Sequence, residues 1–246
     1  LDANKDYTGV RNLTISGELD AATLDISGAI DVAGTTNLDV VDVDGAVNFA
    51  ADVTFADGAD IITASAGTSN FRAGVNAGNS IASGGNYNVV VGDEAGTAIT
   101  TGDNNVALGY KALFTEDTGN RSVAIGDFSL QNQNNADSNY NTAVGYNSGL
   151  AVTTGIRNTL IGGLAGDALT DADLNVAVGY GSLDNDTLGS RSTALGAFTL
   201  GQQTLTTATN TYNTAVGYAA GNSISSGIQN TLIGGLAGDA ITTASN

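Results

Sequence analysis

The sequence predicts an all-β fold: a parallel β-roll, or β-solenoid, with about 17 residues in each turn, assembled as a homotrimeric fibre. The main evidence is a nine-residue motif, typified by Asn141–Gly149, that recurs ten times at a nearly constant spacing. A fixed period of this kind is typical of solenoids in which each turn adds one layer. The obligatory glycine at motif position five marks the copies: Gly74, Gly92, Gly109, Gly126, Gly145, Gly162, Gly179, Gly196, Gly217 and Gly234.

Each motif is expected to begin with a short strand. Side chains alternate across a strand, so positions two and four should share one face and positions one, three and five the other. Position four is aliphatic in nine copies, which predicts a dry stripe along that face. Position three is mostly alanine and is expected to let another chain approach closely, and a second short strand is expected after the glycine. Position one is Asn in eight copies and Ser in two, which predicts side-chain amides bonded from turn to turn.

The residue at position nine defines a longer repeat, because two glycines there are followed by two leucines throughout the motif region. Four turns therefore make one unit. The absence of a starting Met and the incomplete last unit indicate a piece of a longer polypeptide. The predicted organisation is a β-rich shaft segment with alternating strands (1–62), a junction (63–69) and a ten-turn solenoid (70–246) made of superrepeats 70–140, 141–212 and a partial 213–246.

Composition excludes several partners. The chain has 7 Lys and Arg against 25 Asp and Glu, a net charge of −18, which argues against nucleic acid and anionic membrane surfaces. No apolar run approaches the ~20 residues of a membrane helix, so no membrane insertion is expected. The aspartates of the shaft, such as Asp42 and Asp44, could suggest a calcium ladder, but the nonapeptide and EF-hand patterns are missing. We therefore expect a solvated strand face there, and no metal.

No enzymatic activity or cofactor is expected. The chain lacks His, the commonest general acid or base near neutral pH. Val144–Ser148 fits one hexapeptide of the left-handed β-helix acyltransferases, but only about one hexad in three fits. The pairs Glu116–Asp117 and Asp171/Asp173 have no convergent third group and are interpreted as loop charges. An ice-binding solenoid is a further alternative, yet Thr pairs such as Thr153-Thr154 do not recur in every turn.

A roll with so few residues in each turn has a thin core, so we expect it to be stable only as an oligomer. Three rolls around one axis would bury the alanine columns. Ten layers at ~4.8 Å each would give a rod of roughly 50 Å. Arg121 and Arg191 stand at equivalent positions of the first and second superrepeats. Each is expected to pair with a carboxylate of a neighbouring subunit.

The motif also carries a family resemblance. Ser122–Gly126 resembles the head repeat of YadA-like trimeric adhesins, and Asn141–Tyr146 and Asn213–Tyr218 are similar to repeats of phage tail fibres. The resemblance covers residues 70–246 and implies a left-handed β-roll, a homotrimer and attachment to a host cell. It implies location in a virion, with other tail proteins and a host-surface glycan or protein as partners. The alternative is the head of a bacterial trimeric autotransporter-like adhesin at the cell surface.

Two longer turns offer candidate contact sites. The insertions 131–139 and 201–211 occur in equivalent turns and are rich in Gln, Asn, Ser and Thr. Extra residues in a solenoid bulge outward, and such loops often bind. They are interpreted either as spacers or as weak glycan-contacting loops. The tyrosines at position six could likewise stack on sugars or cap the turn. The candidate loop contacts are Gln131, Gln133, Gln202 and Gln203.

Overall fold

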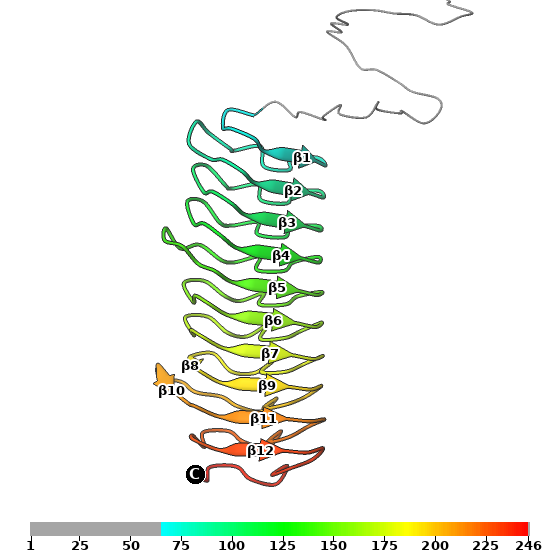
Figure 1. The fold of residues 1–246 in the computed structure, drawn as a ribbon, viewed down its shortest axis with the longest axis vertical. Coiled ribbons are helices and arrows are strands. Elements are labelled where there is room, and N and C mark those ends of the chain that lie inside the picture. Colours follow the sequence, from blue (N-terminus) through cyan, green and yellow to red (C-terminus); the bar gives the residue numbers. More distant parts are fainter. Residues whose placement is uncertain (1–64, 246) are drawn as a thin grey trace, which may run out of the picture. The chain divides into compact units, whose positions relative to one another are not determined.

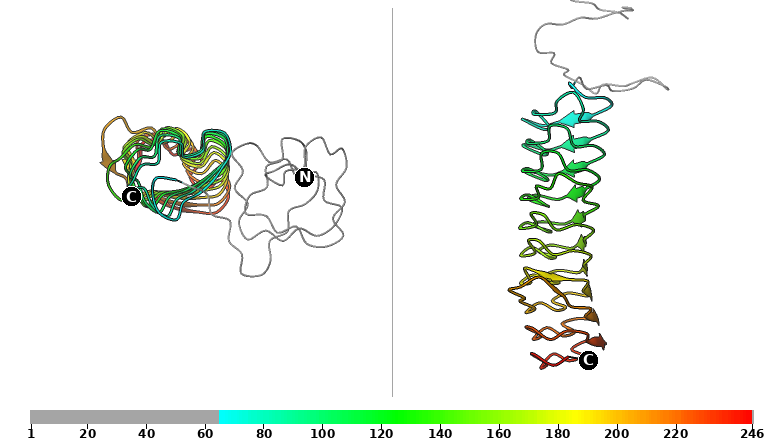
Figure 2. Two further views of the ribbon diagram at one scale, coloured as in Figure 1. Left: turned by 90° about the horizontal axis from the view of Figure 1, so that it is seen from above. Right: turned by 90° about the vertical axis from the view of Figure 1, so that its left-hand side faces the viewer.

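A computed structural model describes residues 65–245, which form an all-β solenoid (Figure 1). Each motif contributes one strand of three residues, and the ten strands form a single parallel sheet in chain order. The turns superimpose when the roll is viewed from above (Figure 2). The predicted shaft (1–62) and the start of the junction lie outside the described residues. The strands are β1 (Phe71–Ala73), β2 (Val89–Val91), β3 (Val106–Leu108), β4 (Val123–Ile125), β5 (Thr142–Val144), β6 (Thr159–Ile161), β7 (Val176–Val178), β9 (Thr193–Leu195), β11 (Thr214–Val216) and β12 (Thr231–Ile233).

The register of the sheet places equal motif positions beside one another. Ala107 pairs with Ala124, and Ala124 with Ala143, so each motif position forms a column along the roll. The larger insertion adds a small second sheet in which β8 (Gly189–Ser190) pairs with β10 (Thr209–Asn210). The smaller insertion forms a single bridge between Asn120 and Ser138. The predicted solenoid is confirmed, with turns of about 17 residues stacked as repeating layers.

The predicted orientation of the strands is wrong. The middle residue of the inner strands, at motif position three, is fully buried inside the roll, as at Ala107 and Ala143. Positions two and four point outward, and Leu108, Ile161 and Leu195 remain 43%, 39% and 41% exposed. The volume inside the roll is limited. Side chains from the rest of the turn fill the interior opposite the strand, so the strand contributes mainly alanine to the core. The alanine column is therefore core and cannot be a subunit interface.

The chain leaves each strand through turns, and the expected second strand is absent between residues 65 and 245. The central glycine has a φ that side chains rarely adopt, for example +138° at Gly145. A Cβ there would lie 2.5 Å from the carbonyl oxygen of Gly162 in the next turn. Motif positions seven and nine are left-handed throughout, as at Phe128 and Leu130. These bends close the turn within a few residues, which leaves no room for a second strand.

The interior is filled differently in the two kinds of turn. Leucine at position nine fills it in four turns, and Leu130, for example, is fully buried. Where glycine stands at position nine, a Cβ would collide with the apolar core: at Gly149 it would lie 2.8 Å from Leu160 and 2.9 Å from Leu130. Position twelve, three residues further on, is apolar in these glycine turns: Ile81, Ile99, Val152, Leu169, Ile224 and Ile241. The four-turn superrepeat is thus a repeat of core packing.

The asparagine column at position one is a hydrogen-bonded ladder, as the sequence predicts. The side-chain oxygen of Asn141 accepts a hydrogen bond from the backbone N–H of Asn158 at 2.8 Å, and that of Asn158 accepts one from Asn175 at 2.9 Å. The side-chain nitrogen of each donates to a backbone carbonyl near the end of its own turn, as Asn158 does to Ala172 at 2.8 Å. The amide groups of the ladder therefore have partners, which a buried polar column requires.

Candidate interaction surfaces

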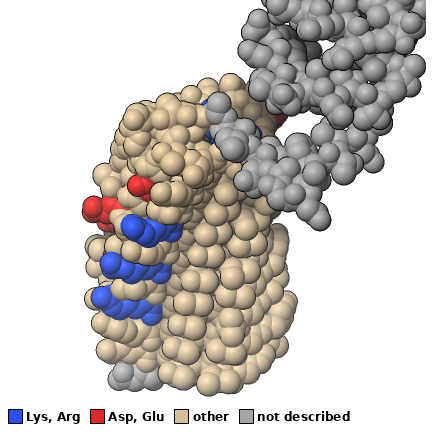
Figure 3. Space-filling model, turned by 45° about the horizontal axis from the view of Figure 1, so that its top comes forward, with Lys and Arg blue, Asp and Glu red and all other residues tan. Residues whose placement is uncertain are grey.

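The strands present an apolar face to solvent along the whole roll. Outward positions two and four carry Val, Thr, Leu, Ile, Phe or Ala in every turn. In Figure 3 most of the charged side chains visible on the roll gather at one side, and few appear on the rest of that surface. Contiguous apolar surface of this extent is typical of a protein interface and is uncommon on a monomer. This strand face is a candidate interaction surface.

One edge of the strand face is the arginine edge, which we define as Arg121, Arg157 and Arg191, each just before motif position one. All three side chains are exposed. Arg121 donates to the hydroxyl of Ser138 at 2.5 Å and lies 5.7 Å from the ring of Tyr140. Arg191 donates to Asn210 at 3.1 Å. Between described residues the single ion pair joins Lys111 to Glu94, so none of these arginines is paired with a carboxylate of the described chain.

The opposite edge is the tyrosine edge, defined as Tyr110, Tyr146, Tyr180 and Tyr218 at motif position six. Their exposed fractions lie between 40% and 59%. Phenylalanines from the intervening turns pack edge to face between them: Phe128 lies 5.2 Å from Tyr110 and 6.0 Å from Tyr146. Phe198 makes the same contacts with Tyr180 and Tyr218, at 5.5 and 6.1 Å. The aromatic side chains therefore brace the turns against one another and still present exposed ring surface.

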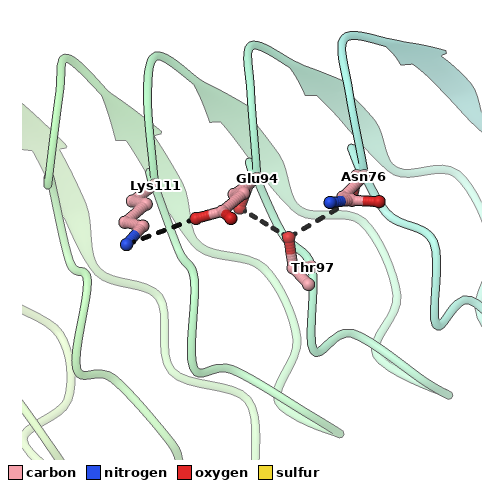
Figure 4. A network of polar contacts seen from close by, with 4 residues as sticks. All are labelled: Asn76, Glu94, Thr97 and Lys111. Carbon is pink, nitrogen blue, oxygen red and sulfur yellow. Dashed lines mark hydrogen bonds and ion pairs between the residues drawn. The ribbon is translucent and has the colours of Figure 1, made fainter.

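A group of polar contacts lies just beyond the tyrosine edge in the first three turns, around motif position seven (Figure 4). Lys111 and Glu94, from successive turns, form an ion pair with 3.3 Å between Nζ and Oε2. The hydroxyl of Thr97 donates to the backbone carbonyl oxygens of Glu94, at 2.8 Å, and of Asn76, at 3.2 Å. These contacts link three turns at the surface.

The four glutamines of the insertions separate into two kinds. Gln202 is exposed and Gln131 is half-buried, so both can meet a ligand. Gln133 and Gln203 are fully buried. The expectation that these two contact a glycan is therefore wrong for the folded chain. Both stand at position twelve, whose side chain points into the roll.

The buried glutamines complete the asparagine ladder where serine interrupts it. Ser122 has no side-chain amide, and the side-chain amide of Gln133 takes the place of the missing group. The Gln133 nitrogen donates to the Ser122 hydroxyl at 2.8 Å, and its oxygen accepts from Asn141 at 2.7 Å. Gln203 does the same between Ser192, at 3.1 Å, and Asn213, at 2.8 Å. The joint occurrence of Ser at position one and Gln at position twelve was the sequence signal for this role.

Each buried glutamine also binds a buried carboxylate from the preceding turn. Gln133 donates to Glu116 at 2.8 Å, and Asn139 donates to the same oxygen at 2.9 Å. Gln203 donates to Asp186 in the equivalent turn. Burial raises the pKa of the Glu116 carboxyl, although the hydrogen bonds from Gln133 and Gly119 favour the charged form. The interpretation of Glu116 as a solvated loop charge is therefore wrong: it is a fully buried structural group, whereas its neighbour Asp117 is half-buried.

Asp167 and Asp184 occupy the same position in successive turns. Burial, and to a smaller extent the charge of Asp184, raises the pKa of Asp167 to about 6. Burial also raises the pKa of Asp184. One carboxyl oxygen of Asp167 is buried and accepts no hydrogen bond. Asp171, by contrast, accepts a hydrogen bond from the Thr154 hydroxyl at 2.5 Å, so that threonine pair is engaged within the chain.

Residues 65–245 hold no group of three or more His, Cys, Asp or Glu side chains arranged to bind a metal ion. In the same residues no helix has the length and hydropathy needed to cross a membrane. Comparison of the chain with models of known protein families, with curated proteins and with solved structures found no match.

Proposed function

We propose that this chain is a segment of a homotrimeric phage tail fibre, which spaces a host-recognition tip from the particle and contributes to host-cell attachment. The observation that carries the proposal is the strand face, whose outward side chains are uncharged and are half-buried or exposed along all ten strands of a single parallel sheet. A face of this kind is expected to pack against a surface of equal length. In the proposed trimer, the two other copies of the roll provide that surface.

The chemistry of the roll supports an extended mechanical role. Its strands are connected layer by layer through backbone hydrogen bonds, the asparagine ladder and the aromatic columns, so length grows by adding turns. Near-duplication of long stretches within the superrepeats, as between residues 141–170 and 213–242, fits a fibre whose length varies by copying modules. Weak receptor contacts would come from the exposed insertions, where Gln131 and Gln202 remain candidates for binding a surface glycan.

The oligomeric part of the proposal is tested by the mass of the chain in solution. The wild-type chain of 24.4 kDa should sediment at about three times that mass. Ile161→Glu places a charge on the strand face and should shift the sedimenting species toward the monomer, because a buried unpaired charge is costly. Ser226→Glu, in an exposed loop, is the matched control and should leave the trimer intact. A monomeric wild-type chain, or equal behaviour of the two variants, would overturn the proposal.

The attachment part needs its own measurement. A fluorescently labelled trimer should bind host cells, and Gln131→Ala with Gln202→Ala should weaken binding without changing the sedimenting mass. Unchanged binding by this double variant would remove the loops from the attachment surface. Tail and baseplate genes beside the coding sequence would support the phage fibre, whereas an encoded outer-membrane anchor would support a bacterial adhesin.

A further inference from the structure

Arginine and apolar side chains alternate in one exposed column along the roll. Counting motifs from the first, the residue just before motif position one is an arginine of the arginine edge in turns four, six and eight. In the turn that follows each arginine it is Tyr140, Leu174 or Tyr212, and these side chains are 51%, 40% and 53% exposed. Equal motif positions stack in register, so the arginines recur every second layer, about 10 Å apart.

Most of the positive charge of the described roll lies in this column. Residues 65–245 contain five Lys and Arg side chains, and three of them form the arginine edge. Of the other two, Lys111 is paired with Glu94, and Arg72 donates to the backbone carbonyl of Ala77 at 2.8 Å. Figure 3 shows positively charged side chains in a line down one side of the roll. A chain with a net charge of −18 thus presents a local positive line.

Neutral groups of the two insertions hold the outer arginines. Ser138, which accepts the hydrogen bond from Arg121, belongs to the first insertion, and Asn210, which accepts the one from Arg191, belongs to the second. Both side chains point toward the next turn, where Tyr140 or Tyr212 follows in the column. A hydroxyl and an amide orient a guanidinium without neutralising it, so the charge remains available to a ligand.

Carboxylates near the column are engaged elsewhere or lie at its side. Asp103 and Asp173 stand one residue before the column, and each accepts a hydrogen bond from a backbone N–H of the preceding turn, that of Asn86 at 2.7 Å and that of Ile156 at 2.8 Å. Asp137, beside Ser138 in the first insertion, is exposed. It opposes an anionic ligand at the first arginine and therefore supplies a test.

We infer that the arginine edge binds a linear acidic polysaccharide of the host surface, laid along the roll with its acidic groups at the guanidiniums. This inference rests on the proposed attachment function and names the class of glycan. A sugar ring is about as long as one layer of the roll, ~4.8 Å. In an extended two-fold ribbon alternate sugars face the same way, so acidic groups on one side recur with every second sugar, as the arginines recur with every second turn.

The column offers a partner to both kinds of sugar in such a ribbon. A guanidinium binds a carboxylate or sulfate through paired N–H groups, which a lysine cannot do. The sugars between them place their C–H faces over Tyr140, Leu174 and Tyr212. Each exposed ion pair is weak alone, so a polymer binds by engaging several at once. Binding should weaken as salt is added, because exposed charges are screened.

Polymannuronate, a β-1,4-linked polyuronate, is the probe, and its methyl ester is the matched neutral polymer. The full wild-type chain should bind the acid and not the ester. Arg157→Gln should raise the Kd by about threefold, because one exposed ion pair is lost. Lys111→Gln makes the same change of charge away from the column and should leave the Kd unchanged. Asp137→Asn should lower the Kd by about twofold, because a repulsive charge is removed.

Sedimentation of each variant separates this inference from the proposed assembly. All variants should keep the mass of the wild type, and loss of the trimer in Arg157→Gln would assign that arginine to a contact between copies and overturn the glycan site. Equal binding of acid and ester, equal effects of Arg157→Gln and Lys111→Gln, or tighter binding of single-stranded DNA would overturn it too. A monomeric wild-type chain that still binds the acid would refute the trimer and leave this inference standing.

Discussion

At the scale of single residues, the central glycine of each motif is required for two independent reasons. Its φ lies in a region that is nearly closed to side chains, and in every motif except that of Gly234 its Cα faces the backbone of the next turn at a distance that excludes a Cβ. Either reason alone would favour glycine. Together they explain why this position never varies among ten copies, whereas its neighbours do.

Gly145→Ala should therefore destabilise the roll by about 3 kcal/mol, from backbone strain and from the 2.5 Å approach to the Gly162 carbonyl oxygen. Gly163→Ala, one turn further and with ordinary φ, should change the free energy of unfolding by under about 0.5 kcal/mol. Urea unfolding of both variants measures the difference. Equal stability would show that the backbone of neighbouring turns moves apart easily.

The two stacked aspartates make the stability of the roll depend on pH. The folded-state pKa of Asp167 is raised to about 6, above its ordinary value of 3.8, so its contribution to stability is full below about pH 4 and is lost as the pH rises through 6. Asp167→Asn should stabilise the chain above pH 6 by on the order of 1 kcal/mol, after allowance for solvent screening of a half-exposed group. The gain should vanish near pH 4. Unfolding curves of wild type and variant that stay parallel from pH 4 to 8 would contradict this assignment.

At the scale of one turn, the interior is built from correlated choices at three motif positions. Asn at position one goes with Gly at position nine and an aliphatic residue at position twelve in six turns. Ser at position one goes with Leu at position nine and Gln at position twelve in the two turns that hold Gln133 and Gln203. The glutamine reaches the space that the missing asparagine amide leaves. The interior is thus filled and hydrogen-bonded in both kinds of turn.

Gln133→Leu should consequently cost about 3 kcal/mol of unfolding free energy, because it removes one hydrogen bond each from Glu116, Ser122 and Asn141, all of which are buried. Gln131→Leu, two residues earlier in the same insertion and half-buried, is the control and should cost under about 0.5 kcal/mol. Thermal and urea unfolding both report the loss. If the two variants lose equal stability, the glutamine does not complete the ladder.

At the scale of the whole roll, the superrepeat sets where the chain can be shortened. Each turn touches only its neighbours, so stability depends on the match between adjacent turns. Removal of residues 141–212 would join turn four to residue 213, and Gln133 would then meet Asn213 as it now meets Asn141. Removal of residues 175–191 would join unlike turns and take Asp186 away from Gln203 and β8 away from β10.

Deletion of the whole superrepeat should accordingly leave the melting temperature within a few degrees of the parent, while deletion of the single turn should lower it by roughly 5 °C or more. Circular dichroism at a fixed chain concentration provides the comparison, and sedimentation should confirm equal assembly. A shorter deletion as stable as the longer one would mean that the unit of the roll is the turn and not the four-turn superrepeat.

The sequence alone determined the period, the strand in each turn, the position of the tight turns and the hydrogen-bonded asparagine column. Each of these follows from local residue type repeated at a fixed step. The inside and outside of the strands were decided by the tertiary structure, because alternation at period two is the same whichever face is enclosed. Enclosure depends on the sum of all side chains around a turn. Leucine and isoleucine from the side of the turn opposite the strand leave room mainly for alanine at the strand. Gln133 and Gln203 lie in the interior, although their sequence context had placed them at the surface.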